Sequence, residues 1–159
     1  MPALMSLLIL LSCPPLSQAA IHDRVVAFVE TQAITLSEFE EQFKKTTAVS
    51  PGITAEEVLD TMVNRILLLK EAKKYRIEAP TPEEVLKEYI DLKVRSFIRV
   101  SDSAGEDFYK KNTSEFGGRE YDKVRGEIES YLTEKMLNEK LKEILRDLRK
   151  GAYIKIQLK

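Results

Sequence analysis

The chain has 159 residues, with 25 Lys or Arg against 26 Asp or Glu, so its formal net charge is -1 at pH 7. This balance gives no electrostatic footprint for nucleic acid or for an anionic membrane surface, and the charges are expected on solvated helix faces. One cysteine and one histidine leave very little for nucleophilic catalysis or for a transition-metal site. We therefore expect no enzymatic activity and no cofactor.

Residues 1–20 have the layout of a secretory signal peptide. They carry no charged residue, an apolar core from Leu4 to Leu11 and a small-x-small triplet at residues 17–19, although no Lys or Arg precedes Leu4. The apolar run is too short to anchor a chain stably across a bilayer. We predict a signal peptide over 1–20, a mature domain over 21–159 and no stable membrane span. The alternative is a lipid-anchored Cys13, because the residues before it loosely resemble a lipoprotein cleavage box.

Two short strands and a helix are expected at the start of the mature domain. Residues 24–30, RVVAFVE, are β-branched and aromatic as in a buried strand, and residues 33–35 offer a second strand after a turn at Thr31 and Gln32. Ser37 and Glu40 have the spacing of a capping box, in which each side chain bonds a free backbone N–H group. The pattern predicts a hairpin followed by a helix over about 37–47.

A central helix is predicted over residues 54–77. It begins with a capping box at Thr54 and Glu57, and its run from Ile66 to Leu69 is apolar on every side. A helix of this kind is stable only when other elements pack against it on every side. We expect it to be covered by the helix before it, the helix after it and the long C-terminal helix.

The next segments are also predicted to be helical. The sequence TPEE at residues 81–84 is a strong start signal for a third helix, which we end near Ile98. A short helix follows over about 103–112, and Gly117-Gly118 breaks the chain. The residues expected on the buried faces of these two helices are Val85, Leu86, Tyr89, Ile90, Val94, Phe97, Ile98, Phe108 and Tyr109.

The last part of the chain predicts a long helix and a strand. Residues 121–150 keep an apolar stripe without proline, and a helix of that length is about 45 Å long, so part of it is expected to project. Gly151 is placed as a C-cap. Residues 152–159 alternate, with Ile154, Ile156 and Leu158 on the expected buried face, and this strand needs a partner. Its only candidates are at residues 24–35, which predicts a mainly α fold whose small β-sheet joins the N-terminal hairpin to the C-terminal strand.

Read in order, the motifs RVVAFVE, ITLSEFE, VLDTMVNRILLLKEAKKYRIEAPTPEEV, VSDSAGEDFYKKNTSEF and AYIKIQL resemble the N-terminal chaperone region of SurA-type periplasmic proteins. The resemblance covers residues 24–159. It implies a helical domain in which the two chain ends come together, in the periplasm. Members usually carry parvulin-type prolyl isomerase domains between the short and the long helix. Here Phe116 is followed by Gly117-Gly118 and then the long helix, so that insert and its histidines are missing.

The resemblance implies an ATP-independent holdase chaperone that binds unfolded outer-membrane or secreted proteins. We expect such clients in a cleft between the long helix and the core helices, on residues such as Met136, Leu137 and Leu141, although each of these could equally pack against the core or a second copy. The alternative hypothesis is a structural or adaptor protein that pairs through its long helix, as a swapped homodimer. Prolyl isomerase activity is not expected, because the acid and base groups are missing.

Overall fold

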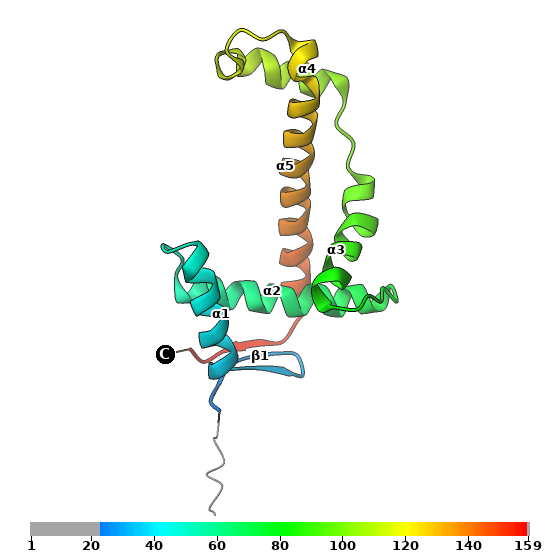
Figure 1. Ribbon diagram of the computed structural model, residues 1–159. Coiled ribbons are helices and arrows are strands. Elements are labelled where there is room, and N and C mark those ends of the chain that lie inside the picture. Colours follow the sequence, from blue (N-terminus) through cyan, green and yellow to red (C-terminus); the bar gives the residue numbers. More distant parts are fainter. Residues whose placement is uncertain (1–22, 159) are drawn as a thin grey trace, which may run out of the picture.

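The computed structural model describes residues 23–158 as a mainly helical fold with one small sheet (Figure 1). This confirms the predicted fold class. The predicted signal peptide over 1–20 and Cys13 lie outside the described residues. None of the helices described is long and apolar enough to cross a membrane. The elements are β1 (Val25–Val29), β2 (Gln32–Thr35), α1 (Leu36–Val49), α2 (Ala55–Lys74), α3 (Pro82–Lys93), η1 (Arg95–Phe97), α4 (Asp102–Lys111), η2 (Thr113–Phe116), α5 (Tyr121–Lys150) and β3 (Ile154–Ile156).

The two ends of the described chain meet in one antiparallel sheet of order β2-β1-β3, as the sequence predicted. The hairpin turn lies one residue earlier than expected, because Val29 pairs with Gln32 and the turn residues are Glu30 and Thr31. Glu30 adopts a left-handed φ of 55°, which is uncommon for a residue with a side chain. Its backbone N–H donates to the Tyr153 carbonyl at 2.7 Å and its carboxylate pairs with Lys70 at 2.9 Å, so neighbouring elements hold the turn.

The first helix corrects the predicted start. It begins at Leu36 because Thr35, still extended at the end of β2, is the N-cap and forms the capping box with Glu38. The sequence contains the same spacing at Ser37 and Glu40, but Ser37 lies inside the helix, where its backbone N–H donates to Asp23 Oδ1 at 3.2 Å. The strand therefore passes directly into the helix, which also continues past the predicted end to Val49.

Helix α2 is the centre of the fold. Thr54 caps it through the predicted capping box with Glu57. Two apolar clusters divide the helix along its length. The first joins the N-terminal half of α2 to the sheet and α1, and the second joins its C-terminal half to α3 and the middle of α5. The expected neighbours thus cover it.

Helix α3 ends earlier than predicted. It stops at Lys93, and the three residues after Val94 form the short 3-10 helix η1. The break turns Val94 into the second cluster and turns Phe97 away from it. The prediction that Phe97 belongs to the buried face is wrong, since its side chain is 77% exposed.

Helix α5 begins and ends at the predicted residues and stands away from the sheet (Figure 1). Its far end carries α4 and η2. There Phe108 contacts Phe116 and Tyr131, and Tyr109 contacts Phe116 and Tyr121, with ring centroids 5.1–6.4 Å apart. Both predicted anchors of the short helix therefore pack. Gly105 allows the close approach, because a Cβ there would lie 2.6 Å from the Tyr121 hydroxyl.

Candidate binding surface

The position of Phe97 is fixed by the residues around it. Arg95 donates to Asp91 of α3 at 3.0 Å and to Glu134 of α5 at 2.5 Å, which ties η1 to the long helix. Val94 is buried on the inner side. With the preceding residues held in this way, the Phe97 ring points to solvent beside α5. An exposed aromatic ring on a tethered turn is available for contact with another chain without rearrangement of the fold.

Two adjoining hollows share Lys93 and Phe97. The first, of about 420 Å³, lies between η1 and α5, and its apolar lining is Val94, Phe97, Ile98 and Met136. The second, of about 560 Å³, lies where α2, α3 and α5 meet, and its apolar and aromatic lining is Tyr75, Tyr89, Phe97, Ile144 and Leu148. We call the exposed part of this region, formed by Tyr75, Lys93, Phe97, Ile98 and Met136, the Phe97 surface.

Aromatic contacts build the α2 side of the Phe97 surface. The rings of Tyr75 and Tyr89 lie 6.0 Å apart, and the Lys93 ammonium lies 4.3 Å from the Tyr75 ring centroid, within cation–π distance. Tyr89 is buried below them, and burial raises the pKa of its hydroxyl, so the ring stays neutral at physiological pH. The surface therefore offers the aromatic rings of Tyr75 and Phe97 beside one ammonium group, that of Lys93.

Charged residues of both signs surround these hollows. Around the first hollow lie Lys93, Glu139, Lys140 and Glu143, and around the second lie Glu71, Lys74, Lys93 and Asp147. Several are engaged with one another, as Lys140 is with Glu143 at 2.7 Å and Lys74 with Glu71 at 2.6 Å. A balanced rim favours neither an acidic nor a basic ligand. What the surface can bind is apolar or aromatic.

The three residues predicted to contact clients occupy different environments. Met136 is 39% exposed and lines the hollow beside Phe97. Leu137 is only 4% exposed and belongs to the second apolar cluster, against which the partly buried Leu141 also packs. The structure thus brings Met136 to the Phe97 surface and assigns Leu137 and Leu141 to internal packing.

Sequence reasoning missed Phe97 and Tyr75 as surface residues. Phe97 continues the apolar spacing of α3, and only the early end of that helix exposes it. Tyr75 is the C-cap residue of α2. No motif marks it. An aromatic residue that directly follows the basic last turn of a helix lies where the chain leaves the helix, and its side chain can reach solvent there.

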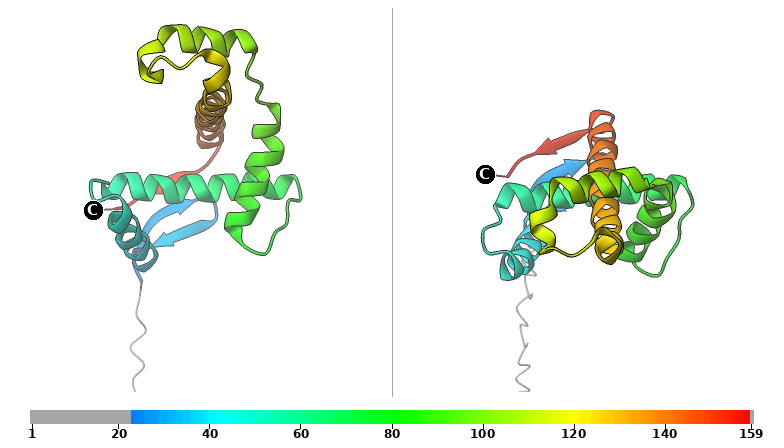
Figure 2. Two further views of the ribbon diagram at one scale, coloured as in Figure 1. Left: turned by 45° about the horizontal axis from the view of Figure 1, so that its top comes forward. Right: turned by 90° about the horizontal axis from the view of Figure 1, so that it is seen from above.

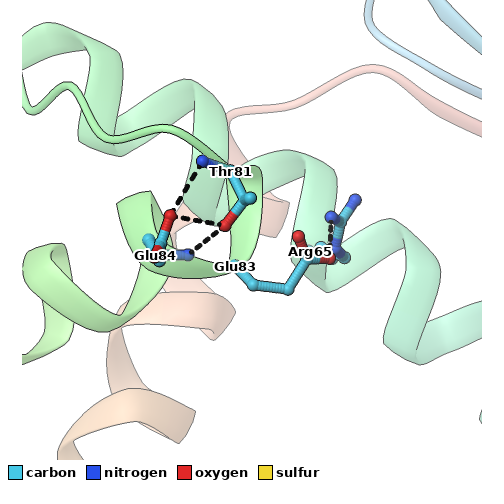
Figure 3. Close-up of polar contacts among 4 residues, drawn as sticks. All are labelled: Arg65, Thr81, Glu83 and Glu84. Carbon is cyan, nitrogen blue, oxygen red and sulfur yellow. Dashed lines mark hydrogen bonds and ion pairs between the residues drawn. The ribbon is translucent and has the colours of Figure 1, made fainter.

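A third hollow, of about 1000 Å³, lies between the β1–β2 turn, α2 and the loop before α3. Its apolar lining is Val29, Ile66, Leu69, Ile77, Ala79, Pro80, Pro82 and Val85. The loop is anchored where α3 begins, because Thr81 and Glu84 form a capping box and Glu83 accepts a hydrogen bond from Arg65 of α2 (Figure 3). None of the strongly exposed aromatic residues of the described chain lines this hollow.

Within residues 23–158, no group of three or more His, Cys, Asp or Glu side chains is arranged to hold a metal ion. Comparison of the chain with known protein families, with curated proteins and with solved structures gave no match. The resemblance to SurA-type chaperones therefore remains an expectation from the motifs in the sequence, and the functional argument depends on the surface itself.

Proposed function

We propose that this protein is an ATP-independent holdase chaperone that binds unfolded outer-membrane or secreted polypeptides in the periplasm through the Phe97 surface. The observation that carries the proposal is the exposure of Phe97, which lies between two hollows with Met136 and Tyr75 beside it. Exposed apolar patches with polar rims usually mark interaction sites. The predicted export of the chain and the order of its motifs support the location and the class of client.

The chemistry of the surface suits unfolded chains more than one folded partner. It offers flexible Met136, two aromatic rings and a rim with both charge signs, a combination that tolerates many apolar sequences. Each hollow offers only a few apolar side chains for contact, so binding is expected to be weak and reversible. That behaviour delays aggregation without trapping the client.

A light-scattering assay tests the proposal. A denatured β-barrel protein is diluted into buffer without ATP, alone or with several-fold excess of this protein, and we expect aggregation to slow. Phe97→Ser should lose most of this effect. Val49→Ser is the matched control, because Val49 is 85% exposed on α1, outside both hollows. Failure of the unaltered protein to slow aggregation would overturn the holdase, and equal loss in both variants would overturn the assignment of the surface.

Sedimentation separates the holdase from the alternative of pairing through α5. The holdase is expected to sediment as a monomer that shifts on addition of unfolded client. A stable dimer in which Met136 becomes protected from oxidation would instead favour the structural or adaptor role, because the exposed stripe of α5 would then be covered by a second copy.

A further inference from the structure

Strand β3 leaves one of its edges unpaired among the described residues. Tyr153 accepts from Glu30, Gln157 donates to Val26 and Lys155 pairs with Phe28, so every second residue of this segment bonds β1. In an antiparallel ladder the residues between them point their N–H and C=O groups the other way. The backbone groups of Ile154 and Ile156 therefore face outward, and Figure 2 shows β3 at the margin of the sheet with no strand or helix beyond it.

The core beside this edge is incompletely covered. Ile154, Ile156 and Leu158 share one face of the strand, and Ile154 and Leu158 pack against the first cluster as predicted. Ile156 does not, since it is 53% exposed, and this corrects the predicted buried face. It borders a hollow of about 630 Å³ whose other apolar lining is Leu36, Phe39, Ala55, Leu59 and Leu158.

We infer that the outer edge of β3 binds an extended segment of an unfolded polypeptide as a fourth strand of the sheet. The inference rests on the proposed function and adds a second client site to it. The backbone of the segment pairs with the outward N–H and C=O groups of Ile154 and Ile156. An apolar side chain of the segment, next to Ile156, covers the hollow at its open border.

The charges beside the hollow define the segment further. The charged residues that line the hollow are three acids, Glu40, Glu56 and Asp60, and one base, Arg24. Asp60 also pairs with Arg149 at 2.8 Å. This rim favours a segment with apolar residues at alternate positions and a basic residue at its end. A second copy of the chain fits less well. If two copies paired antiparallel through the backbone groups of Ile154 and Ile156, Lys155 of one copy would lie opposite Lys155 of the other. Like charges in directly opposed positions are destabilising.

The test uses a fluorescent peptide in which valine and threonine alternate between terminal lysines, with binding followed by anisotropy. A second peptide carries methyl groups on the backbone nitrogens of both the valines and the threonines, so that neither of its edges can donate hydrogen bonds to β3. We expect the unmodified peptide to bind and the methylated peptide to bind at least about tenfold more weakly, because several backbone hydrogen bonds are lost. Equal binding of the two peptides would overturn the inference.

Matched variants locate the site. Ile156→Pro removes an outward-facing N–H group and keeps the hydrogen bonds between β3 and β1. Edge strands tolerate proline at such a position. It should weaken peptide binding at least about tenfold. Ile156→Thr retains the N–H group and should bind more tightly than Ile156→Pro. Wild-type affinity in Ile156→Pro would overturn the inference, and if this variant does not fold, the methylated peptide still decides the question.

The outcomes separate the two proposals. Val49→Ser should bind the peptide as the unaltered protein does, because Val49 lies outside the hollow beside β3. Suppression of aggregation without peptide binding would overturn the β3 site and leave the holdase standing, whereas peptide binding without suppression would overturn the holdase and leave the β3 site. A dimer that dissociates on Ile156→Pro would assign the edge to a second copy and overturn the unfolded segment as its occupant.

Discussion

Thr54 and Glu57 close the first turn of α2 with reciprocal hydrogen bonds. The Glu57 carboxylate accepts from the Thr54 backbone N–H at 2.8 Å, and the Thr54 hydroxyl accepts from the Glu57 backbone N–H at 3.2 Å. Hydrogen bonds from the Thr54 backbone and side chain lower the pKa of Glu57 below its ordinary value of 4.5. A carboxylate with a lowered pKa stabilises the folded state above the unfolded pKa and loses that contribution as the pH falls through the folded pKa.

We therefore expect Glu57→Ala to lower the midpoint of thermal unfolding at pH 7, and the difference from the unaltered protein to narrow as the pH falls below about 4.5. Circular dichroism melts over a pH series measure this. Glu56→Ala is the control, because Glu56 lies in the same first turn without the reciprocal bonds. A difference for Glu57→Ala that stays constant down to pH 3 would contradict the account.

Capping residues were the part of the fold that could be predicted best. Thr54 and Thr81 begin their helices as expected, because an N-cap depends on the local backbone and a few neighbouring side chains. Thr35 shows the limit of that reasoning. Two overlapping T/S-x-x-E spacings compete there. The pairing of β2 with β1, which joins residues that are not neighbours in the sequence, selects the earlier spacing.

At the scale of elements, α5 presents two faces with different roles. Leu137 packs in the second cluster, while its neighbour Met136 lines the hollow beside Phe97. Adjacent residues on a helix project about 100° apart, so the apolar stripe of the sequence was wider than the core could cover. Periodicity predicted the stripe correctly, but it could not show which part of it the turn at Val94 would leave open.

This difference predicts opposite effects of two neighbouring substitutions. Leu137→Ala should destabilise the protein by about 3 kcal/mol, because it opens a cavity in a packed cluster. Met136→Ala should cost less than about 1 kcal/mol but weaken the suppression of aggregation. Urea unfolding and light scattering, measured on both variants, provide the comparison. An intact holdase effect in Met136→Ala, or full stability in Leu137→Ala, would contradict these roles.

Strand β3 was predicted as an element and as a partner of the N-terminal strands, because an isolated strand cannot satisfy its backbone groups. Its exposed Ile156 was not predicted. Alternation assigns a side chain to a face, and it does not report whether anything covers that face at the edge of a sheet.

At the scale of the whole molecule, the sheet and the far end of α5 are held in different ways. The sheet, α1 and the N-terminal half of α2 share the larger apolar cluster. The segment that carries α4 and η2 lies across the far end of α5 (Figure 2). It packs there through aromatic side chains and an Arg125–Asp102 ion pair at 2.6 Å. Exposed ion pairs of this kind contribute little to stability.

Amide hydrogen exchange should reflect this division. Backbone amides of β1 and of the N-terminal half of α2 are expected to exchange slowest, and those of α4 and η2 faster, because local opening there exposes less apolar area. Exchange measured by mass spectrometry on peptic fragments resolves these segments. Equal protection of α4 and β1 would show that the molecule opens as one unit.

The central claim is that unfolded polypeptides bind at the Phe97 surface, and site-specific photocrosslinking tests it most directly. Benzoylphenylalanine replaces Phe97 in one variant and Val49, which is at least as exposed, in another, and each is irradiated with an unfolded β-barrel protein. We predict strong crosslinks from position 97, weak ones from position 49, and loss of the position 97 crosslinks once the client has folded. Crosslinks of equal strength from both positions, or none from position 97, would contradict the account.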